Sequence, residues 1–202
     1  QEGDNRLEAR AGETVDQTLV TYKKVPTDAS LLHDIAINVG SRCYYQSEKT
    51  GITWVADRAY SKGSWGHIGG ISAATQTEIA CTDDGPLYQT MQKGIEGYRF
   101  DVVEGNYELE LLFADTRQKQ ARSVYLLGKD KKQIDAGGQQ VGFDMLVNGK
   151  SIETDFLPGK EFGFFTALRR SYLVKVGKDG LHVKFQSKDG NTFLSGIRLR
   201  KL

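Results

Sequence analysis

The sequence predicts an all-β protein with a jelly-roll-like antiparallel β-sandwich, and three observations lead to that prediction. The 202 residues include 23 Gly and only 3 Pro, with the glycines spread among Tyr, Phe, Val and Ile as in chains of short strands and tight turns. Apolar and polar residues alternate with a period of two in many segments. No long stretch carries the apolar stripe of a helix. About eight or more short strands of this kind favour a sandwich or jelly roll.

Residues 1–33 differ from the rest and are predicted to be a polar linker or N-terminal extension. Charged side chains follow one another without a sustained period from Gln1 to Gln17, which is typical of a linker or a frayed start. Leu19–Tyr22 is a candidate edge strand that ends before Pro26. We expect the β-sandwich domain to span residues 34–202.

The strands of that domain are identified by their alternation. Apolar residues occupy the odd positions from Tyr107 to Phe113, whereas Glu108 and Glu110 lie on the other face, as in a half-buried strand. The expected strands, in order, are Ile35–Val39, Tyr98–Val103, Asn106–Phe113, Phe143–Val147, Lys150–Glu153, Tyr172–Val176, Leu181–Gln186 and Ile197–Arg200.

Turn residues separate these strands. Asn148-Gly149 predicts a tight hairpin turn, because both residues tolerate positive φ. Lys178-Asp179-Gly180 and Lys188-Asp189-Gly190 indicate two more turns. Asp115 to Lys132 is interpreted as a long excursion between strands.

Charge and composition exclude several classes of partner. The formal net charge is +1, from 27 basic and 26 acidic residues, so no basic face for nucleic acid or for a membrane surface is expected. The mean hydropathy is −0.46, and no run approaches the roughly 20 apolar residues of a membrane span. Cys43 and Cys81 are either two buried thiols or a disulfide, and their spacing leaves both open.

The residues of a catalytic site are missing. The sequence has no Gly-x-Ser-x-Gly element and no phosphate-binding glycine motif. Asp83 and Asp84 precede Gly85-Pro86 and are interpreted as turn residues, and His182 as a surface residue. We therefore expect no catalytic residues, no cofactor and no catalytic metal. A structural calcium stays open, although no loop of the sequence indicates one.

Residues 43–70 are unusually rich in aromatic residues and glycine, which predicts a loop that binds sugar. A sugar ring has an apolar face that stacks on a flat aromatic side chain and a rim of hydroxyls that needs polar partners. Trp54 and Tyr60 are expected to pack beneath the loop. Trp65 is either a core residue or a ligand contact. The segment also contains Tyr44, Tyr45 and His67.

An ordered series of motifs identifies a family that the chain resembles. The motifs are Ile37-Asn38-Val39-Gly40-Ser41, Trp54-x-x-Asp57-x-x-Tyr60, Gly69-Gly70, Leu87-Tyr88-Gln89-Thr90, Tyr98-x-Phe100-x-Val102, Gly105-x-Tyr107-x-Leu109-x-Leu111-x-Phe113-Ala114-Asp115, Phe143-Asp144-x-x-Val147-Asn148-Gly149 and Ser195-Gly196-Ile197. In this order they resemble the malectin and malectin-like carbohydrate-binding modules, over residues 34–202. Similar modules are appended to bacterial glycoside hydrolases of family 2, β-galactosidases in particular.

The resemblance implies that loops at one end of the sandwich bind sugar. Asp189 matches the position of the family's ligand-binding acid, and the family's tyrosine in the glycine-rich segment falls near Trp65 and His67. The aromatic pair after Phe-Ala-Glu is replaced here by Thr116-Arg117, and Met91, Gln92 and Lys93 stand where a further tyrosine is expected. The expected carbohydrate-binding residues are Tyr44, Tyr45, Trp65, His67, Arg117 and Asp189.

The expected function is that of a non-catalytic carbohydrate-binding module, the accessory domain of a β-galactosidase-like glycoside hydrolase. Its partners would be an oligosaccharide or polysaccharide and the catalytic domains of the same parent chain, in the periplasm or outside the cell. The alternative is a structural module that docks on the parent hydrolase without binding sugar. The sugar, the oligomeric state and the identity of the parent stay open.

Overall fold

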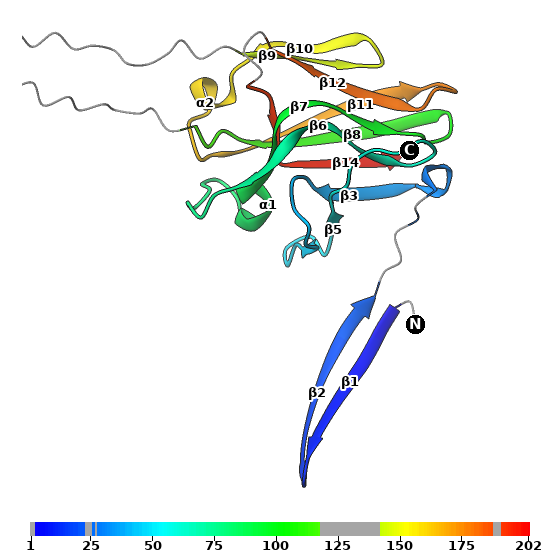
Figure 1. The fold of residues 1–202 in the computed structure, drawn as a ribbon, viewed down its shortest axis with the longest axis vertical. Coiled ribbons are helices and arrows are strands. Elements are labelled where there is room, and N and C mark those ends of the chain that lie inside the picture. Colours follow the sequence, from blue (N-terminus) through cyan, green and yellow to red (C-terminus); the bar gives the residue numbers. More distant parts are fainter. Residues whose placement is uncertain (1–2, 23–25, 27, 118–141, 188–190) are drawn as a thin grey trace, which may run out of the picture.

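A computed structural model describes residues 3–22, 26, 28–117, 142–187 and 191–202 (Figure 1). The strands are β1 (Gly3–Ala11), β2 (Thr14–Tyr22), β3 (Asp34–Asn38), β4 (Tyr45–Gln46), β5 (Thr53–Ala56), β6 (Trp65–Ala74), β7 (Thr90–Phe100), β8 (Gly105–Ala114), β9 (Phe143–Val147), β10 (Lys150–Phe156), β11 (Ala167–Val176), β12 (Leu181–Gln186), β13 (Phe193–Leu194) and β14 (Gly196–Lys201). The helices are a 3₁₀ turn at Ala29–Leu31, α1 (Gly85–Gln89) and α2 (Pro158–Glu161).

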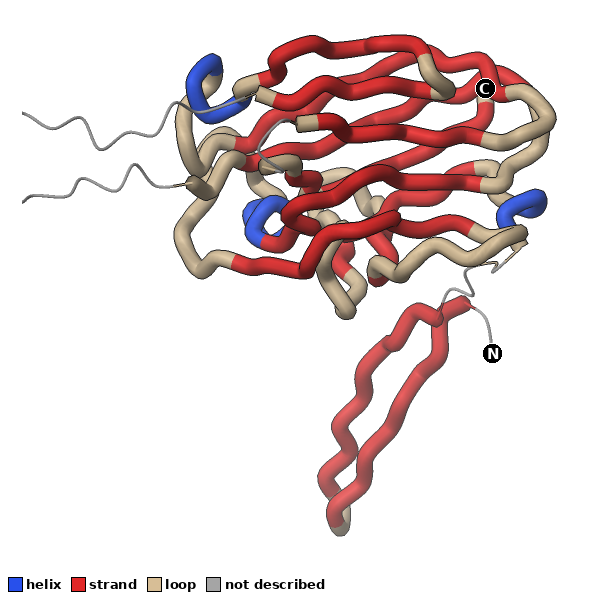
Figure 2. Tube along the Cα trace, turned by 45° about the horizontal axis from the view of Figure 1, so that its top comes forward, coloured by secondary structure: helices blue, strands red, loops and turns tan. Residues whose placement is uncertain are grey.

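Two sheets pack face to face, which confirms the predicted β-sandwich (Figure 2). One sheet has the order β10-β9-β12-β7-β13, and β6 also pairs with β7. The other has the order β11-β8-β14-β3-β5-β4, and only its β3–β5 pair is parallel.

The core lies between the sheets and follows from the alternation of side chains along the strands. In β8, Tyr107, Leu109, Leu111 and Phe113 point into this core and are at most 1% exposed. Leu112 lies on the other face of β8, where it joins a smaller cluster with Trp54 on the outside of the sheet. Both faces of this sheet are therefore partly covered. For this reason β8 has apolar residues at consecutive positions, rather than at alternate ones, toward its end.

The predicted hairpin turn at Asn148-Gly149 is confirmed. Asn148 has φ of 48° and Gly149 has φ of 79°, the left-handed backbone that a two-residue turn between right-twisted strands requires. The turn fixes the register of β9 and β10, with Lys150 opposite Val147. The predicted turn at Lys188–Gly190 lies outside the described residues.

Residues 1–33 differ from the polar linker that the sequence predicts, because β1 and β2 form a hairpin. Its register runs from Gly3 opposite Tyr22 to Ala11 opposite Thr14, and the chain reverses at Gly12, which has φ of 62°. Polar residues obscure the pattern, since neither face of this ribbon is buried by the sandwich (Figures 1 and 2). The expected edge strand at Leu19–Tyr22 is the second half of β2.

The glycine-rich segment is also not the loop that the sequence predicts, because Trp65–Ala74 forms the strand β6. A register shift between Ile68 and Gly69 interrupts its pairing with β7, and Gly69 and Gly70 have φ of 68° and 84°. These glycines belong to a bulge, the irregularity that breaks a period of two in an otherwise paired strand.

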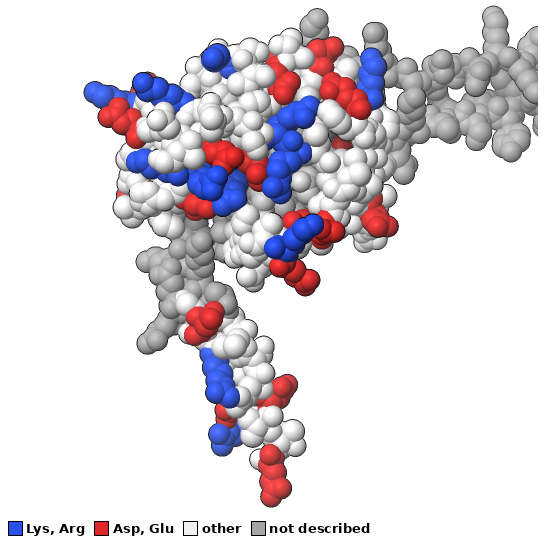
Figure 3. Space-filling model, turned by 180° about the vertical axis from the view of Figure 1, so that it is seen from behind, with Lys and Arg blue, Asp and Glu red and all other residues white. Residues whose placement is uncertain are grey.

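The two cysteines are exposed and unpaired, so they form neither the buried thiols nor the disulfide that the sequence left open. Within the described chain, no helix is long and apolar enough to cross a membrane. Charged side chains of both signs alternate over the back of the sandwich (Figure 3). Three of their ion pairs, Arg198–Asp34, Arg200–Glu108 and Arg169–Glu110, link neighbouring strands of one sheet.

Candidate functional site

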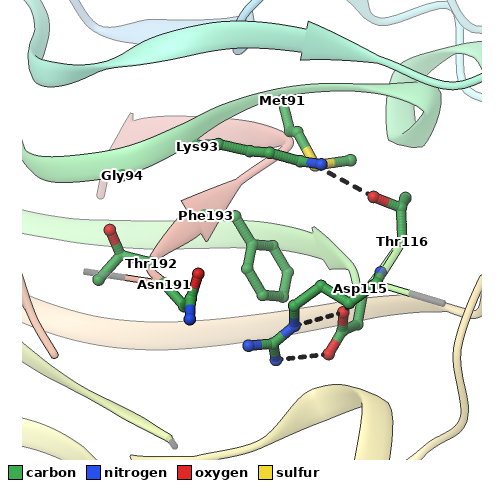
Figure 4. A pocket seen from close by; sticks show the side chains of 9 residues that line it. Met91, Lys93, Gly94, Asp115, Thr116, Asn191, Thr192 and Phe193 are labelled. Atoms are coloured by element: carbon green, nitrogen blue, oxygen red, sulfur yellow. Dashed lines mark hydrogen bonds and ion pairs between the residues drawn. The ribbon is translucent and has the colours of Figure 1, made fainter. Parts of the chain in front are cut away.

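A cavity of about 120 Å³ opens at one end of the sandwich, where β7 begins and β8 ends (Figure 4). We call this end the pocket end, and the opposite end, where β7 finishes and β8 begins, the far end. The lining residues are Met91, Lys93, Gly94, Asp115, Thr116, Arg117, Asn191, Thr192 and Phe193. The volume accommodates part of one sugar ring rather than several.

The strand pairing explains why these distant residues meet. Phe193 in β13 lies opposite Lys93 in β7, so the two side chains leave the same face of the sheet. Met91 lies two residues before Lys93 and shares that face. Thr192 anchors the turn into β13, since its hydroxyl donates to the Ile95 carbonyl over 2.6 Å.

Phe193 forms the apolar floor of the cavity and is 4% exposed. Its ring lies 5.5 Å from that of Phe143 and 6.2 Å from that of Phe113, centre to centre. These edge-on contacts hold the ring in place from below. The Arg117 guanidinium lies 5.4 Å from the centre of the Phe193 ring, within cation–π range.

Arg117 closes one wall and is held there by Asp115. Nε of Arg117 donates to Oδ1 of Asp115 over 2.8 Å, and Nη2 donates to Oδ2 over 2.6 Å. The Arg117 amide also donates to Oδ1. The Asp115 side chain is fully buried, whereas 23% of the Arg117 side chain is exposed. Three bonds from one residue therefore occupy the carboxylate, and the guanidinium presents its remaining N–H groups outward.

Helix α2 seals the other side of Asp115. A Cβ atom placed on Gly159 would come within 2.4 Å of Oδ2 of Asp115, so the backbone of α2 passes directly over the carboxylate. A ligand in the cavity consequently meets the guanidinium of Arg117 and not the carboxylate of Asp115.

Lys93 contributes the second cation. Its side chain is exposed and extends across the opening above Phe193 (Figure 4). Among the described residues, Lys93 has no ion-pair partner. The walls of the cavity thus carry two cations, one neutralised by Asp115, together with the hydroxyl of Thr116 and the amide of Asn191.

Trp65 is not a ligand contact in this arrangement. Its side chain is 3% exposed, beneath the Arg58 guanidinium at 4.0 Å from the ring centre. Trp65 lies opposite Phe100, seven residues along β7 from Lys93, a distance of roughly 23 Å. Trp65 and Arg117 therefore lie at opposite ends of the sandwich and do not form one site.

His67 is occupied by a structural contact. Its Nδ1 lies 2.9 Å from Oδ2 of Asp57. Asp57 also accepts hydrogen bonds from the amides of Gly40 and Arg58 and from the hydroxyl of Tyr98. This buried network connects loops to β6 and β7. His67 lies opposite Tyr98, five residues along β7 from Lys93, and does not line the cavity.

Tyr44 and Tyr45 lie next to the small outer cluster, not at the cavity. Tyr44 is 60% exposed, and the hydroxyl of Tyr45 donates to Asp84 over 2.8 Å. Burial, followed by the hydrogen bond to Asp84, raises the pKa of Tyr45 to about 12. An open groove beside Tyr45 is lined by Lys49, Asp83 and Asp84.

Of the six expected binding residues, Arg117 alone is placed at the cavity by the described structure. Asp189 lies outside the described residues. Sequence reasoning did not select Phe193 or Lys93. Lys93 stands at a position that the family motif singles out, and Phe193 lies two residues before the Ser195-Gly196-Ile197 motif. The sequence therefore marks both positions, but it does not show that the two residues lie opposite each other.

Comparisons with known proteins identify the family and agree with the fold. The family model described as "Malectin domain" matches residues 33–198. The structure of a Bacteroides uniformis beta-glucuronidase matches with 34% identity and a TM-score of 0.79, covering 98% of this chain and 22% of that chain. A calcium-binding mutant of Bacteroides uniformis beta-glucuronidase 2 matches with 34% identity and a TM-score of 0.80, covering 100% and 23%.

A more distant match shows the fold alone. The plant receptor-like kinase FER is 16% identical, with a TM-score of 0.61, covering 84% of this chain and 42% of that one. No curated protein matches. The chain spans less than a quarter of the length of the hydrolases it matches, and those are beta-glucuronidases, not the β-galactosidases that the sequence led us to expect.

Proposed function

Since the chain belongs to the malectin domain family, we propose that it is a non-catalytic carbohydrate-binding module whose ligand occupies the cavity at the pocket end. The observation that carries the proposal is the combination of an aromatic floor, Phe193, with fixed polar side chains around it. Sugar sites need this combination of an apolar surface and directed hydrogen bonds. Affinity is modest, because each hydroxyl bond replaces one to water.

We also propose that the module is an accessory domain of a longer glycoside hydrolase. The support is the 34% identity to one part of a beta-glucuronidase chain that is more than four times longer. This similarity favours a hydrolase of glucuronides as the parent. By tethering the parent to its polysaccharide, the module raises the effective concentration of substrate at the catalytic domain. We place such a parent in the periplasm or outside the cell, where polysaccharides are found.

The test compares two asparagines at the two ends of the sandwich. Asn191 lines the cavity, and Asn106 lines a groove at the far end. A glycan array identifies the sugars that the chain binds, and calorimetric titration then measures their affinity. Asn191→Ala should weaken binding about three- to tenfold through a lost hydrogen bond, whereas Asn106→Ala should leave it unchanged. Absence of binding at millimolar sugar, or equal effects of both variants, would contradict the proposal.

A further inference from the structure

We infer that the cavity at the pocket end recognises an acidic sugar, a residue that carries a carboxylate, in preference to a neutral one. The inference rests on the proposed function and deepens it. Its basis is the sign of the charges that a ligand meets on the described part of the lining, where the ionisable side chains are Lys93, Asp115 and Arg117.

The first step is that the carboxylate of Asp115 is closed to a ligand. It is fully buried, its oxygens accept three hydrogen bonds from Arg117, and the backbone of α2 lies against it. A neutral sugar that used an acid to accept its hydroxyl protons would find no free acceptor on this side chain. Asp115 instead fixes the orientation of Arg117.

The second step is that Arg117 keeps one edge of its guanidinium free of Asp115. The ion pair uses Nε and one N–H of Nη2, so Nη1 and the second N–H of Nη2 remain. These two nitrogens form a planar fork of the kind that binds a carboxylate through two parallel hydrogen bonds.

The third step is the net charge. Asp115 neutralises Arg117, and Lys93 adds an ammonium group above the Phe193 ring (Figure 4). The described residues of the lining therefore carry one excess positive charge over an apolar floor. A uronic acid matches this arrangement, because its ring stacks on Phe193 while its carboxylate lies between the two cations.

The experiment titrates the 202-residue chain with glucuronic acid, galacturonic acid, glucose and glucose 6-sulfate. We expect at least one uronic acid to bind about tenfold more tightly than glucose, with an affinity that falls as salt is added. Lys93→Gln should remove most of this preference. Lys62→Gln is the matched control, because Lys62 lines a separate groove at the far end.

The outcomes separate this inference from the proposed function. Glucose binding as tightly as both uronic acids would overturn the inference and leave the proposed function intact, whereas binding of none of the sugars would count against both. The sulfated sugar binding as tightly as the uronic acids would overturn the assignment of a carboxylate. An equal loss in both lysine variants would show that only the overall charge matters, which also overturns the inference.

A second inference rests on the β1–β2 hairpin. We propose that one face of this hairpin docks on the body of the parent hydrolase in the same polypeptide. The register places Leu7, Ala9, Ala11 and Val20 on one face, together with Asn5, Asp16 and Thr18. The other face carries the charged residues Asp4, Arg6, Glu8 and Arg10, together with Val15 and Leu19. The first face thus has one charged side chain and the second has four. Leu7 is 55% exposed and Val20 is 43% exposed, and no residue of the hairpin joins either hydrophobic cluster of the described chain.

Two observations select the occupant of this less charged face. A two-stranded hairpin is marginally stable without a layer to pack on, so the face needs a partner. The match to beta-glucuronidase covers 98–100% of this chain, and therefore includes the hairpin residues. The same match leaves more than three quarters of the hydrolase chain outside it, which supplies a docking body in the same polypeptide.

Hydrogen exchange tests this second inference in the 202-residue chain and in the parent polypeptide. Hairpin amides should exchange rapidly in the 202-residue chain and be protected in the parent polypeptide. Leu7→Asn should lower the thermal stability of the parent, whereas Leu19→Asn, on the charged face, should not. Protection that rises with concentration in the shorter chain would identify a second copy as the occupant, and concentration-independent protection would identify its own sandwich. Either result, or equal effects of the two variants, overturns the proposal that the hairpin docks on the parent hydrolase. None of these outcomes affects the tests of sugar binding.

Discussion

At the scale of single residues, the buried carboxylate of Asp57 is the centre of a hydrogen-bond network outside the cavity. Its side chain is 3% exposed and accepts hydrogen bonds from the amides of Gly40 and Arg58 and from the hydroxyl of Tyr98, with His67 at 2.9 Å. Burial and the neighbouring Asp57 carboxylate raise the pKa of Tyr98 well above its ordinary value, so the phenol stays a donor. The carboxylate thereby joins two loops to two strands.

Asp57→Asn should lower the free energy of unfolding by about 2–4 kcal/mol, because an amide nitrogen cannot accept the bonds that Oδ2 accepts and leaves buried donors unpaired. Urea unfolding measures the change. Asp83→Asn is the control: Asp83 makes an exposed pair with Lys49, and its loss should leave the free energy of unfolding nearly unchanged, because solvent screens exposed pairs. Similar losses in both variants would show that the Asp57 network is not a stabilising centre.

His182 in β12 makes stability depend on pH. Burial, and then the positive charges of Arg99 and Lys184, lower the pKa of His182 below its ordinary value of 6.5. The unfolded chain therefore binds this proton at higher pH than the folded chain, and stability falls as the pH drops below about 6.5. Thermal unfolding between pH 5 and 8 should show a smaller decline for His182→Gln and for Lys184→Gln. A decline unchanged in both variants would assign it to other groups.

At the scale of elements, the link between β3 and the start of β7 depends on one glycine. Gly40 has φ of 77°, and a Cβ atom there would lie 2.2 Å from the Met91 carbonyl oxygen. The close approach of these backbones brings the end of β3 against the strand that carries Lys93. A side chain at Gly40 would push apart the two elements beneath the cavity.

Gly40→Ala should cost more than about 3 kcal/mol, since it adds a steric clash to the strain of positive φ. Gly51→Ala separates the two effects, because Gly51 has φ of 67° but nothing within 4 Å of the added Cβ. That variant should lose only about 1–2 kcal/mol. Chemical denaturation compares them, and equal losses would show that the contact with Met91 relaxes freely.

The elements also show which part of the structure the sequence predicts. Strand β8 was predictable because one of its faces packs against the core while the other carries Glu108 and Glu110. The alternation of apolar and polar residues in its sequence therefore matches its surroundings. Strand β6 was not predictable, because its glycines form a bulge that interrupts the alternation of its two faces. The hairpin was missed because neither of its faces is buried by the sandwich. Local alternation thus predicts strands with one face on the core and the other in solvent. It fails where a bulge breaks the period, as in β6, or where no core is contacted, as in the hairpin.

At the scale of the whole molecule, the candidate site could be predicted only in part. Arg117 was accessible from its place after the Phe113-Ala114-Asp115 motif. Its neighbours Lys93 and Phe193 are 100 residues apart in sequence, and only the pairing of β7 with β13 brings them together. Trp65 was a plausible ligand contact by residue type, but the sheet register places it at the other end.

Trp65→Phe therefore separates stability from binding. The variant loses the indole N–H contact with the Pro26 carbonyl and part of the cation–π contact with Arg58, which should cost about 1–3 kcal/mol. Sugar affinity measured by calorimetry should stay within twofold, because the cavity lies roughly 23 Å away. A tenfold loss of affinity in a folded variant would place the sugar near Trp65 instead.

Both ends of the sandwich domain's backbone leave from the far end. The amide of Ala29 donates to the Gly63 carbonyl, and the amide of Leu202 donates to the Asn106 carbonyl, so the first and last residues of the domain lie together and away from the cavity (Figure 1). Anything fused at either side, whether an enzyme, a fluorophore or a solid support, would point the mouth of the cavity outward. The module can therefore be immobilised through either terminus with its ligand-facing surface unobstructed.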